Sequence, residues 1–325
     1  MTAVRLVRAA LAILLFGAPW AAAQQPARIA WLGSGSESGS AVFMSAFKQG
    51  LKENSLIENR DYIIDARYAD NRYERFPALV QDLLQREPAV IMVVTVASVR
   101  AAQHATTKVP IVMMGTNDPV GVGLITSLAR PGGNTTGLST MAEDVAGKYL
   151  QMLHELRPQA RHLAVLVNPE NPTSAKIIFE RVKSTAHDMG VSAYAVKLTG
   201  ADDIDTVFDA MARDRPDALA IASDLSFLDR HPHICAAALK RRILVLAPSP
   251  DFADGGCLVG FGTSRRELYR SAATYVKKIF AGARPGDLPV EQPTRVELTI
   301  NLKSARALGL AIPPTMMLRA DKVIE

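Results

Sequence analysis

Strand-like apolar runs alternate with helical patterns along almost the whole chain after residue 26. The run at 89–95 is almost continuously apolar, as expected of a strand that helices cover on both faces. Between the first two strand-like runs, Phe43, Phe47 and Leu51 recur at the four-residue spacing of one helix face. The other strand-like runs are 27–33, 62–68, 109–115, 162–168, 192–198, 217–223 and 243–249. This alternation predicts an α/β fold in which parallel sheets lie between layers of helices.

Two segments of the chain share one layout. Residues 87–115 and 215–249 each read as strand, small-residue turn, helix and strand, and the second includes a helix predicted from Phe227 to Arg241. We interpret this duplication as two Rossmann-like, doubly wound lobes. Breaks at 132–144, 259–264 and 288–294 mark the predicted crossings between the lobes. The predicted lobes are 27–139 with 263–293, and 140–262 with 294–325.

The first 23 residues have the pattern of a secretory signal peptide. Arg5 and Arg8 precede an apolar stretch that is too short to span a membrane comfortably, and a small-residue cleavage pattern ends at Ala23. An uncleaved signal anchor is the alternative. No other apolar run is long enough to span a membrane, so we expect an exported chain without an integral membrane segment.

Composition excludes some partners. Without Arg5 and Arg8 the formal charge falls from +5 to +3, and the basic residues are scattered apart from pairs such as Arg265-Arg266, which we interpret as solvated helix faces. We therefore predict no nucleic-acid partner. An oxidising compartment would permit a disulfide between Cys235 and Cys257. Because one lies in a helical pattern and the other begins a strand-like run, we favour two buried free thiols.

Small or polar residues follow five of the strands. In open parallel sheets ligands bind outside the carboxyl ends of the strands, where helix N-termini can hold an anion. Helix capping explains the polar residues after any single strand. Polar residues after five strands together favour a surface, here called the rim, that faces a ligand. The candidate ligand-binding residues are Ser34, Ser36, Thr95, Ala97, Ser98, Thr116, Asn117, Asp118, Asn168, Asn171, Ser174, Ser223 and Asp224. A carboxylate at Asp224 suits an ammonium group, so the rim as a whole suits a zwitterion.

Catalytic and metal motifs are weak. The glycine pattern from Gly33 to Gly39 is one residue longer than the dinucleotide fingerprint, and Glu37 occupies the position that a nucleophile elbow gives to serine. His231 and His233 are two residues apart, which places their rings on different faces of a helix; we interpret them, with Pro232 between them, as a helix start. We predict no catalytic residue, metal site or cofactor.

Several segments are similar to one protein family. They are AFKQGLKE (46–53), YADNRYERFPALVQDLL (68–84), GTNDPVGVGLITSLARPGGNTTGLS (115–139), LAVLVNPENP (163–172), FADGGCLVGFG (252–262) and LPVEQPTRVELTINLKSARALGLAIP (288–313). On these residues the chain resembles the ABC transporter substrate-binding family that includes tryptophan/tyrosine-type periplasmic binding proteins. The resemblance implies a type I periplasmic-binding-protein fold, with a three-stranded hinge and a small-molecule solute in the cleft between two lobes.

The resemblance also implies roles and partners. The turn at Thr95, Ala97 and Ser98 matches a family pattern expected to hold a ligand carboxylate, although Val96 replaces the family's proline. Asp224 matches the acidic position expected to face a ligand ammonium. The implied protein is a periplasmic monomer that is not an enzyme and delivers an amino acid or related carboxylate to an ABC permease and its ATPase. Phe227 and Phe252 either stack on an aromatic ligand or belong to the core.

Two other functions stay open at this point. A periplasmic sensor that feeds a membrane receptor would use the same fold. An exported α/β hydrolase or transferase would need a nucleophile, a base and an orienting group, and the sequence offers no convincing set.

Overall fold

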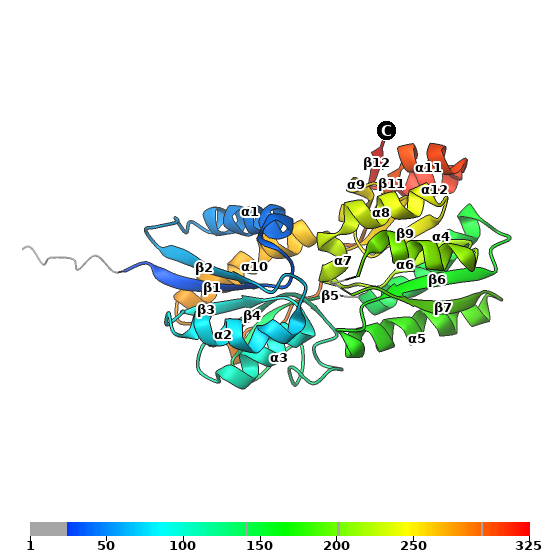
Figure 1. Cartoon of the computed structure of the whole chain (residues 1–325). Helices are drawn as coiled ribbons and strands as arrows, with labels where there is room; N and C mark the ends of the chain where they lie inside the picture. Colours follow the sequence, from blue (N-terminus) through cyan, green and yellow to red (C-terminus); the bar gives the residue numbers. More distant parts are fainter. Residues whose placement is uncertain (1–24, 141, 200–201, 294) are drawn as a thin grey trace, which may run out of the picture.

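The computed structural model describes residues 25–140, 142–199, 202–293 and 295–325. The predicted signal peptide lies outside these ranges. The described chain forms two lobes side by side, each a sheet with helices on both faces (Figure 1). The predicted α/β fold class, two doubly wound lobes, is confirmed.

The first lobe is built on a five-stranded sheet. Its strands are β1 (Ala27–Gly33), β2 (Tyr62–Tyr68), β3 (Val90–Val93), β4 (Ile111–Asn117) and β5 (Thr135–Thr140). They lie in the order β2-β1-β3-β4-β5 and are parallel throughout, with Ala27 paired to Tyr62 and Ile29 paired to Val90. All five carboxyl ends therefore meet at one edge of the sheet.

Alternate residues of β1 determine which helices cover which face. Ile29 and Trp31 pack into the core with α1 (Glu37–Glu53) and α10 (Arg265–Phe280), whereas Ala30 and Leu32 pack with α2 (Phe76–Leu84) and α3 (Val96–Ala105). This follows from the two-residue period of a strand. The short 3-10 helix η1 (Tyr73–Arg75) leads into α2.

The second lobe is built on a seven-stranded sheet. Its strands are β6 (His162–Val167), β7 (Ser192–Lys197), β8 (Ala218–Ile221), β9 (Leu244–Ala247), β10 (Val259–Gly262), β11 (Glu297–Asn301) and β12 (Lys322–Ile324). They lie in the order β12-β11-β10-β9-β8-β6-β7, and within the described residues only the β10–β11 pair is antiparallel. The helices are α4 (Ala142–Leu156), α5 (Pro172–Asp188), α6 (Ile204–Arg213), α7 (Leu225–Asp229), α8 (His231–Lys240), α9 (Pro250–Asp254), α11 (Leu302–Leu308) and α12 (Pro314–Arg319).

The chain passes between the two sheets three times. It leaves the first sheet between β5 and α4, and returns between β10 and α10. After α10, the 3-10 helix η2 (Pro285–Asp287) and a bridge from Glu291 to Leu138 lie against the first sheet, and the chain then enters β11 of the second. Helix α10, drawn in orange, consequently lies beside the blue α1 although more than 200 residues separate them (Figure 1).

The helix predicted from Phe227 to Arg241 is wrong in one respect: it is two helices. Helix α7 ends at Asp229, and α8 begins at His231 with Pro232 in its first turn. Proline lacks a backbone N–H and is tolerated only at the start of a helix, so the chain has to begin a new helix there. The Nδ1 atom of His231 lies 2.6 Å from the carbonyl oxygen of Leu228 and satisfies one of the last acceptors of α7.

The prediction of two free thiols is also wrong, because Cys235 and Cys257 form a disulfide. Cys235 lies on the buried side of α8. A turn at Gly255 and Gly256, the latter with φ of 103°, brings the chain back beneath α8 and leaves the two Cα atoms 4.7 Å apart. Both cysteines are almost completely buried. The strand-like pattern around Cys257 concealed this turn, which precedes β10.

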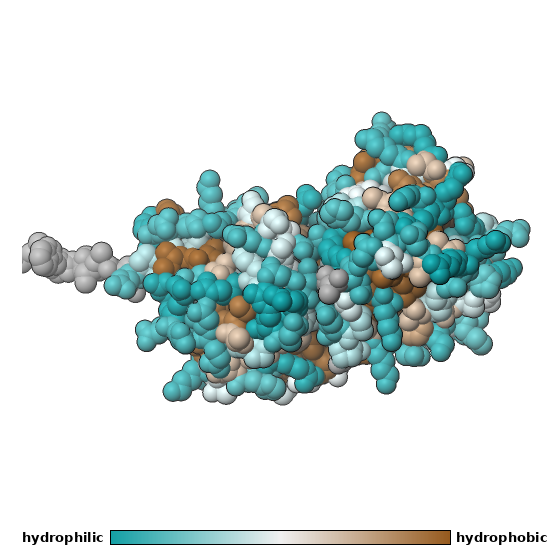
Figure 2. Space-filling model, in the orientation of Figure 1, coloured by the Kyte–Doolittle hydropathy of each residue, from teal (hydrophilic) through white to brown (hydrophobic). Residues whose placement is uncertain are grey.

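The surface seen in Figure 2 is mostly polar, as is usual for a globular protein. Hydrophilic residues predominate on the face seen in Figure 2, and apolar residues form small groups. Within the described ranges no helix is long and apolar enough to cross a membrane.

The disulfide yields a stability prediction. It closes a loop between residues 22 positions apart, and loss of such a crosslink costs roughly 3 kcal/mol. The Cys235→Ser/Cys257→Ser variant should therefore unfold at lower denaturant concentration, with the free energy of unfolding reduced by about that amount. Thiol titration of the unreduced, denatured wild type should find no free thiol; two free thiols would contradict the crosslink.

Candidate ligand-binding site

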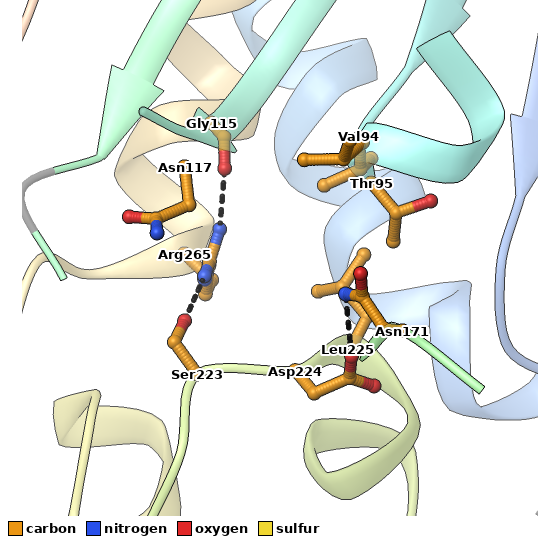
Figure 3. A pocket seen from close by; sticks show the side chains of 10 residues that line it. Val94, Thr95, Gly115, Asn117, Asn171, Ser223, Asp224, Leu225 and Arg265 are labelled. Atoms are coloured by element: carbon orange, nitrogen blue, oxygen red, sulfur yellow. Dashed lines mark hydrogen bonds between the residues drawn. The ribbon is translucent and has the colours of Figure 1, made fainter. Parts of the chain in front are cut away.

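A pocket lies where the carboxyl ends of the two sheets face each other (Figure 3). We call it the polar pocket. From the first lobe it is lined by the end of β3 and by the end of β4, and from the second lobe by the loops that follow β6 and β8. Its lining residues are Val94, Thr95, Val96, Gly115, Asn117, Asn171, Ser223, Asp224, Leu225 and Arg265. Five of the predicted site residues are thus brought together in one space between the lobes.

Asp224 provides the negative charge of the polar pocket. It is the N-cap of α7, and its Oδ1 accepts hydrogen bonds from the backbone N–H of Ser226 at 3.0 Å and from the Ser226 hydroxyl at 2.7 Å. Oδ1 also accepts from Tyr73 at 3.0 Å and from Asn168 at 3.1 Å, and Oδ2 accepts from Asn171 at 3.0 Å. Every one of these donors is neutral, so the carboxylate is held in place with its charge unneutralised by an ion pair in the described chain.

The hydroxyl of Tyr73 reaches Asp224 from the other lobe. Burial is the main cause that raises the pKa of Tyr73 well above its ordinary value, and the adjacent Asp224 carboxylate raises it further. The hydroxyl therefore stays protonated and donates a hydrogen bond to Asp224 across the cleft. This hydrogen bond joins the two lobes at the wall of the polar pocket.

Arg265 provides the positive charge. It is the first residue of α10 and is 9% exposed, and its Nη1 donates to the carbonyl oxygen of Gly115 at 3.0 Å while Nη2 donates to Ser223 Oγ at 2.9 Å (Figure 3). Its acceptors thus come from both lobes. No carboxylate of the described residues forms an ion pair with this guanidinium. Burial is the main cause that lowers the pKa of Arg265, and the nearby Tyr269, Asp251 and Asp224 oppose it. An arginine stays protonated at neutral pH, so the pocket holds a buried cation without a direct ion pair among the described residues.

Sequence reasoning missed Arg265. The Arg265-Arg266 pair was interpreted as a solvated helix face, but only Arg266 has that character, with half of its side chain exposed. A signal was present. A cation in the first turn of a helix opposes the helix dipole and so needs another reason to be there, and this helix follows directly on a predicted crossing.

The polar groups of the predicted turn after β3 mainly form hydrogen bonds with one another. Thr95 Oγ1 accepts from the backbone N–H of Ser98 at 3.1 Å, and the Ser98 hydroxyl pairs with the backbone of Thr95 in a capping box. Ser98 is fully buried, and Ala97 lies beside the pocket without lining it. Thr95 and Val96 line the pocket, so the N-terminus of α3 opens onto it.

The remaining predicted residues divide among several roles. Thr116 donates to the carbonyl oxygen of Val94 at 2.6 Å and fixes the end of β4. Asp118, with φ of 36°, accepts from the backbone N–H of Gly121 at 2.8 Å and shapes the next loop. Asn168 holds Asp224 without lining the polar pocket. The side chain of Ser174, in α5, lies outside the described side chains.

A second compartment adjoins the polar pocket and shares Val94 and Leu225 with it. We call it the aromatic compartment. Its other lining residues are Trp31, Gly33, Ser34, Gly35, Gly39, Ser40, Phe43, Leu228, Asp229 and Tyr269. The ring of Tyr269 stacks on Phe43 at 5.1 Å and lies 5.5 Å from Trp31. Two buried polar atoms at this compartment, Trp31 Nε1 and Ser34 Oγ, have no hydrogen-bond partner among the described residues.

Phe227 and Phe252 are not part of either space. Each is 1% exposed and packs in the hydrophobic core of the second lobe, against helices rather than the cleft. The aromatic rings near the cleft come instead from β1, α1 and α10 of the first lobe. Within the described residues, no group of three or more histidines, cysteines or carboxylates is arranged to hold a metal ion.

Comparison with known proteins finds one family and several relatives. The family model "ABC transporter substrate binding protein" matches residues 36–324. A tyrosine-binding protein of Clostridioides difficile is 23% identical over 264 residues, which cover 81% of this chain and 75% of the relative.

Solved structures share the fold. A conserved domain protein from Vibrio cholerae matches with a TM-score of 0.82 at 23% identity, covering 92% of this chain and all of the other. An ABC domain from Streptococcus pneumonia in complex with L-Trp matches with a TM-score of 0.79 at 20% identity, covering 91% of this chain and all of the other. A leucine-binding protein from Thermotoga maritima matches with a TM-score of 0.58 at 11% identity, covering 84% of this chain and 97% of the other.

These likenesses confirm the resemblance read from the sequence and the type I periplasmic-binding-protein fold. The family consists of solute-binding proteins rather than enzymes. With a family match across residues 36–324, this chain belongs to the ABC transporter substrate-binding protein family.

Proposed function

We propose that this protein is the exported solute-binding component of an ABC importer and that it binds an amino acid in the cleft between its lobes. One observation carries the proposal: a buried arginine and a buried carboxylate, neither in an ion pair within the described chain, line one pocket. In the proposed complex the ligand carboxylate contacts Arg265 and the ligand ammonium contacts Asp224.

The energetic argument rests on desolvation. A buried charge without a direct ion pair is costly, and Arg265 and Asp224 would each be stabilised further by a ligand that brings an adjacent charge of opposite sign. Asp224 Oδ2 receives only one described hydrogen bond, from Asn171, and so retains room to accept a second. A zwitterion satisfies both residues at once, whereas a simple carboxylate satisfies Arg265 alone.

Binding is expected to couple to closure of the lobes. Arg265 contacts Gly115 of the first lobe and Ser223 of the second, so a ligand bound to Arg265 favours the arrangement in which both contacts are made. We propose that residues 27–139 with 263–293 move as one body and residues 140–262 with 294–325 as the other. The three crossings between the sheets would then form the hinge.

We further propose that the ligand side chain occupies the aromatic compartment. That compartment continues from the polar pocket and presents the rings of Trp31, Phe43 and Tyr269. The compartment has only about 20 Å³ of free volume in this structure, so an aromatic side chain would enter with a shift of the lining rings; it would then stack there, and a polar group at its end would meet Trp31 Nε1 and Ser34 Oγ. The named ligands of two relatives, tyrosine and tryptophan, belong to this class.

The cellular role follows from family and from the N-terminal sequence. We propose export to the periplasm with cleavage near Ala23, and delivery by a monomer to a permease and its ATPase. A sensor that passes the bound state to a membrane receptor would bind the same ligand. Deleting the gene separates the two roles: loss of labelled amino-acid uptake supports import, and intact uptake with a lost transcriptional response supports sensing.

The carboxylate contact predicts an effect of Arg265→Met. Charged hydrogen bonds of this kind contribute about 1.5–3 kcal/mol, so the variant should bind L-tyrosine about 10- to 150-fold more weakly in calorimetry. The control is L-tyrosinamide, which lacks the carboxylate and should bind wild type and variant with similar weak affinity. Equal loss for both compounds would place the carboxylate elsewhere.

The ammonium contact predicts an effect of Asp224→Asn. The amide keeps the size of the side chain but removes its charge, and it should weaken L-tyrosine binding by at least about tenfold. The deaminated analogue 3-(4-hydroxyphenyl)propionate should be affected much less, because it has no ammonium group. Unchanged affinity for L-tyrosine in this variant would show that the amine does not meet Asp224.

The aromatic compartment predicts a change in specificity rather than in overall affinity. Trp31→Phe keeps an aromatic ring but removes the indole N–H that faces no described acceptor. The wild type should prefer L-tyrosine to L-phenylalanine, and the variant should lose most of that preference, as competition binding would measure. A preference that survives intact would show that Trp31 does not contact the ligand hydroxyl.

A further inference from the structure

Ser36 and Asn71 of the first lobe both donate hydrogen bonds to Asp229 of the second. We propose that these three residues form an inter-lobe latch that stabilises the closed state and slows release of ligand, separately from the charges of the polar pocket. Ser36 was singled out in the sequence as a candidate ligand contact. Its hydroxyl accepts a hydrogen bond from the backbone N–H of Gly39 and donates to the Asp229 carboxylate.

The latch has four donor–acceptor contacts. The Asp229 carboxylate accepts from the Ser36 hydroxyl at 3.2 and 3.3 Å, from the Ser36 backbone N–H at 3.4 Å and from Asn71 Nδ2 at 3.1 Å. Ser36 is the N-cap of α1, which is 17 residues long. A carboxylate at this end of a helix is stabilised by the unpaired N–H groups and by the helix dipole. Opening the lobes would remove Asp229 from this position.

Two glycines make room for Asp229. A Cβ atom built at Gly39 would lie 1.2 Å from Asp229 Oδ1, and one at Gly35 would lie 3.0 Å from its Cγ. Neither glycine needs a left-handed backbone, since φ lies outside the positive region at both. Their lack of a side chain is therefore explained by the close approach of the other lobe, which the latch requires.

The loop that carries Asn71 is held in an unfavourable conformation. Asp70 and Asn71 have φ of 53° and 61°, two successive left-handed residues that are not glycine. Their backbone N–H groups donate to the carbonyl oxygens of Gly35 and Ser34, which ties this loop to the one before α1. Strain of this kind persists where surrounding contacts impose it, and here it places the Asn71 amide against Asp229.

The latch also closes the aromatic compartment. Asp229 and Gly39 line that compartment, whereas Asn71 lines neither it nor the polar pocket. The closed state is thus stabilised by contacts that need no ligand atom. Because the apparent affinity of a ligand depends on the fraction of molecules in the competent state, these contacts set release rate and affinity together.

The position of Asn71 allows a clean experiment. Asn71→Gly removes the amide but retains a residue that tolerates positive φ, and Asp229→Asn removes the charge. Gly39→Ala adds a methyl group where the Asp229 carboxylate lies. We would measure the radius of gyration of each ligand-free variant by small-angle X-ray scattering, and the dissociation rate of L-tyrosine by stopped-flow tryptophan fluorescence.

Controls match each change. Gly147→Ala is a helical glycine substitution with no neighbour within 4 Å of the added carbon, and Asp188→Asn removes an exposed carboxylate whose ion pair is with the adjacent His187. Both controls should leave scattering and dissociation unchanged. Thermal unfolding of every variant checks that the two lobes stay folded.

The expected result is a larger radius of gyration for all three latch variants and roughly tenfold faster release of L-tyrosine from Asn71→Gly and Asp229→Asn. The effect of combining these two changes should be smaller than the sum of the two single effects, because both weaken the Asn71–Asp229 hydrogen bond. Scattering curves identical to wild type would overturn the proposal. The proposal would also be overturned if L-tyrosine bound more weakly to Asp229→Asn but with unchanged affinity to Asn71→Gly, because Asp229 would then be a ligand contact. If wild type fails to bind L-tyrosine, the assigned ligand is wrong, and the ligand-free scattering alone decides about the latch.

Discussion

The buried guanidinium of Arg265 is the interaction on which the cleft depends. It donates to Gly115 of one lobe and to Ser223 of the other, and both acceptors are neutral. Across the same pocket Asp224 is held only by neutral donors. The fold therefore places two opposite charges in one pocket without a direct ion pair between them. In the proposed complex, a ligand that carries both complementary charges would pair with both residues and so link recognition to lobe closure.

Contacts of two kinds join the two lobes. The polar pocket, through Arg265 and the Tyr73–Asp224 hydrogen bond, connects the lobes around the space for a ligand. The latch at Asp229 connects them through protein atoms alone. Such a division lets the strength of closure change without altering recognition, since Asn71 lines neither space. Both kinds of contact arise at the carboxyl ends of parallel strands, which is why one edge of each sheet carries all of them.

The sequence predicted the parallel sheets, the two lobes and the pocket residues Thr95, Asn117, Asn171, Ser223 and Asp224, because periodicity and strand-tip chemistry are local. It did not predict the roles that depend on distant pairing. Arg265 looked like a surface residue until β10 and α10 placed it between the lobes, and Ser36 acquires its partner from a residue 193 positions away. The Cys235–Cys257 disulfide needs a turn at Gly255 and Gly256 that strand-like residues concealed. Aromatic rings suited to the cleft came from Trp31, Phe43 and Tyr269, whereas Phe227 and Phe252 were needed in the core.

Helix α10 has a consequence for how the polypeptide matures. It covers the same face of the first sheet as α1, and Trp31 of β1 is buried in one cluster with Phe43 and Phe47 of α1 and Tyr269 of α10. The amino-terminal part of the chain therefore lacks the helix that shields this face until about residue 280 has been synthesised. Completion of the first lobe needs α10, which follows strands β6 to β10 of the second lobe in the chain, so the two lobes have to fold with their segments interleaved.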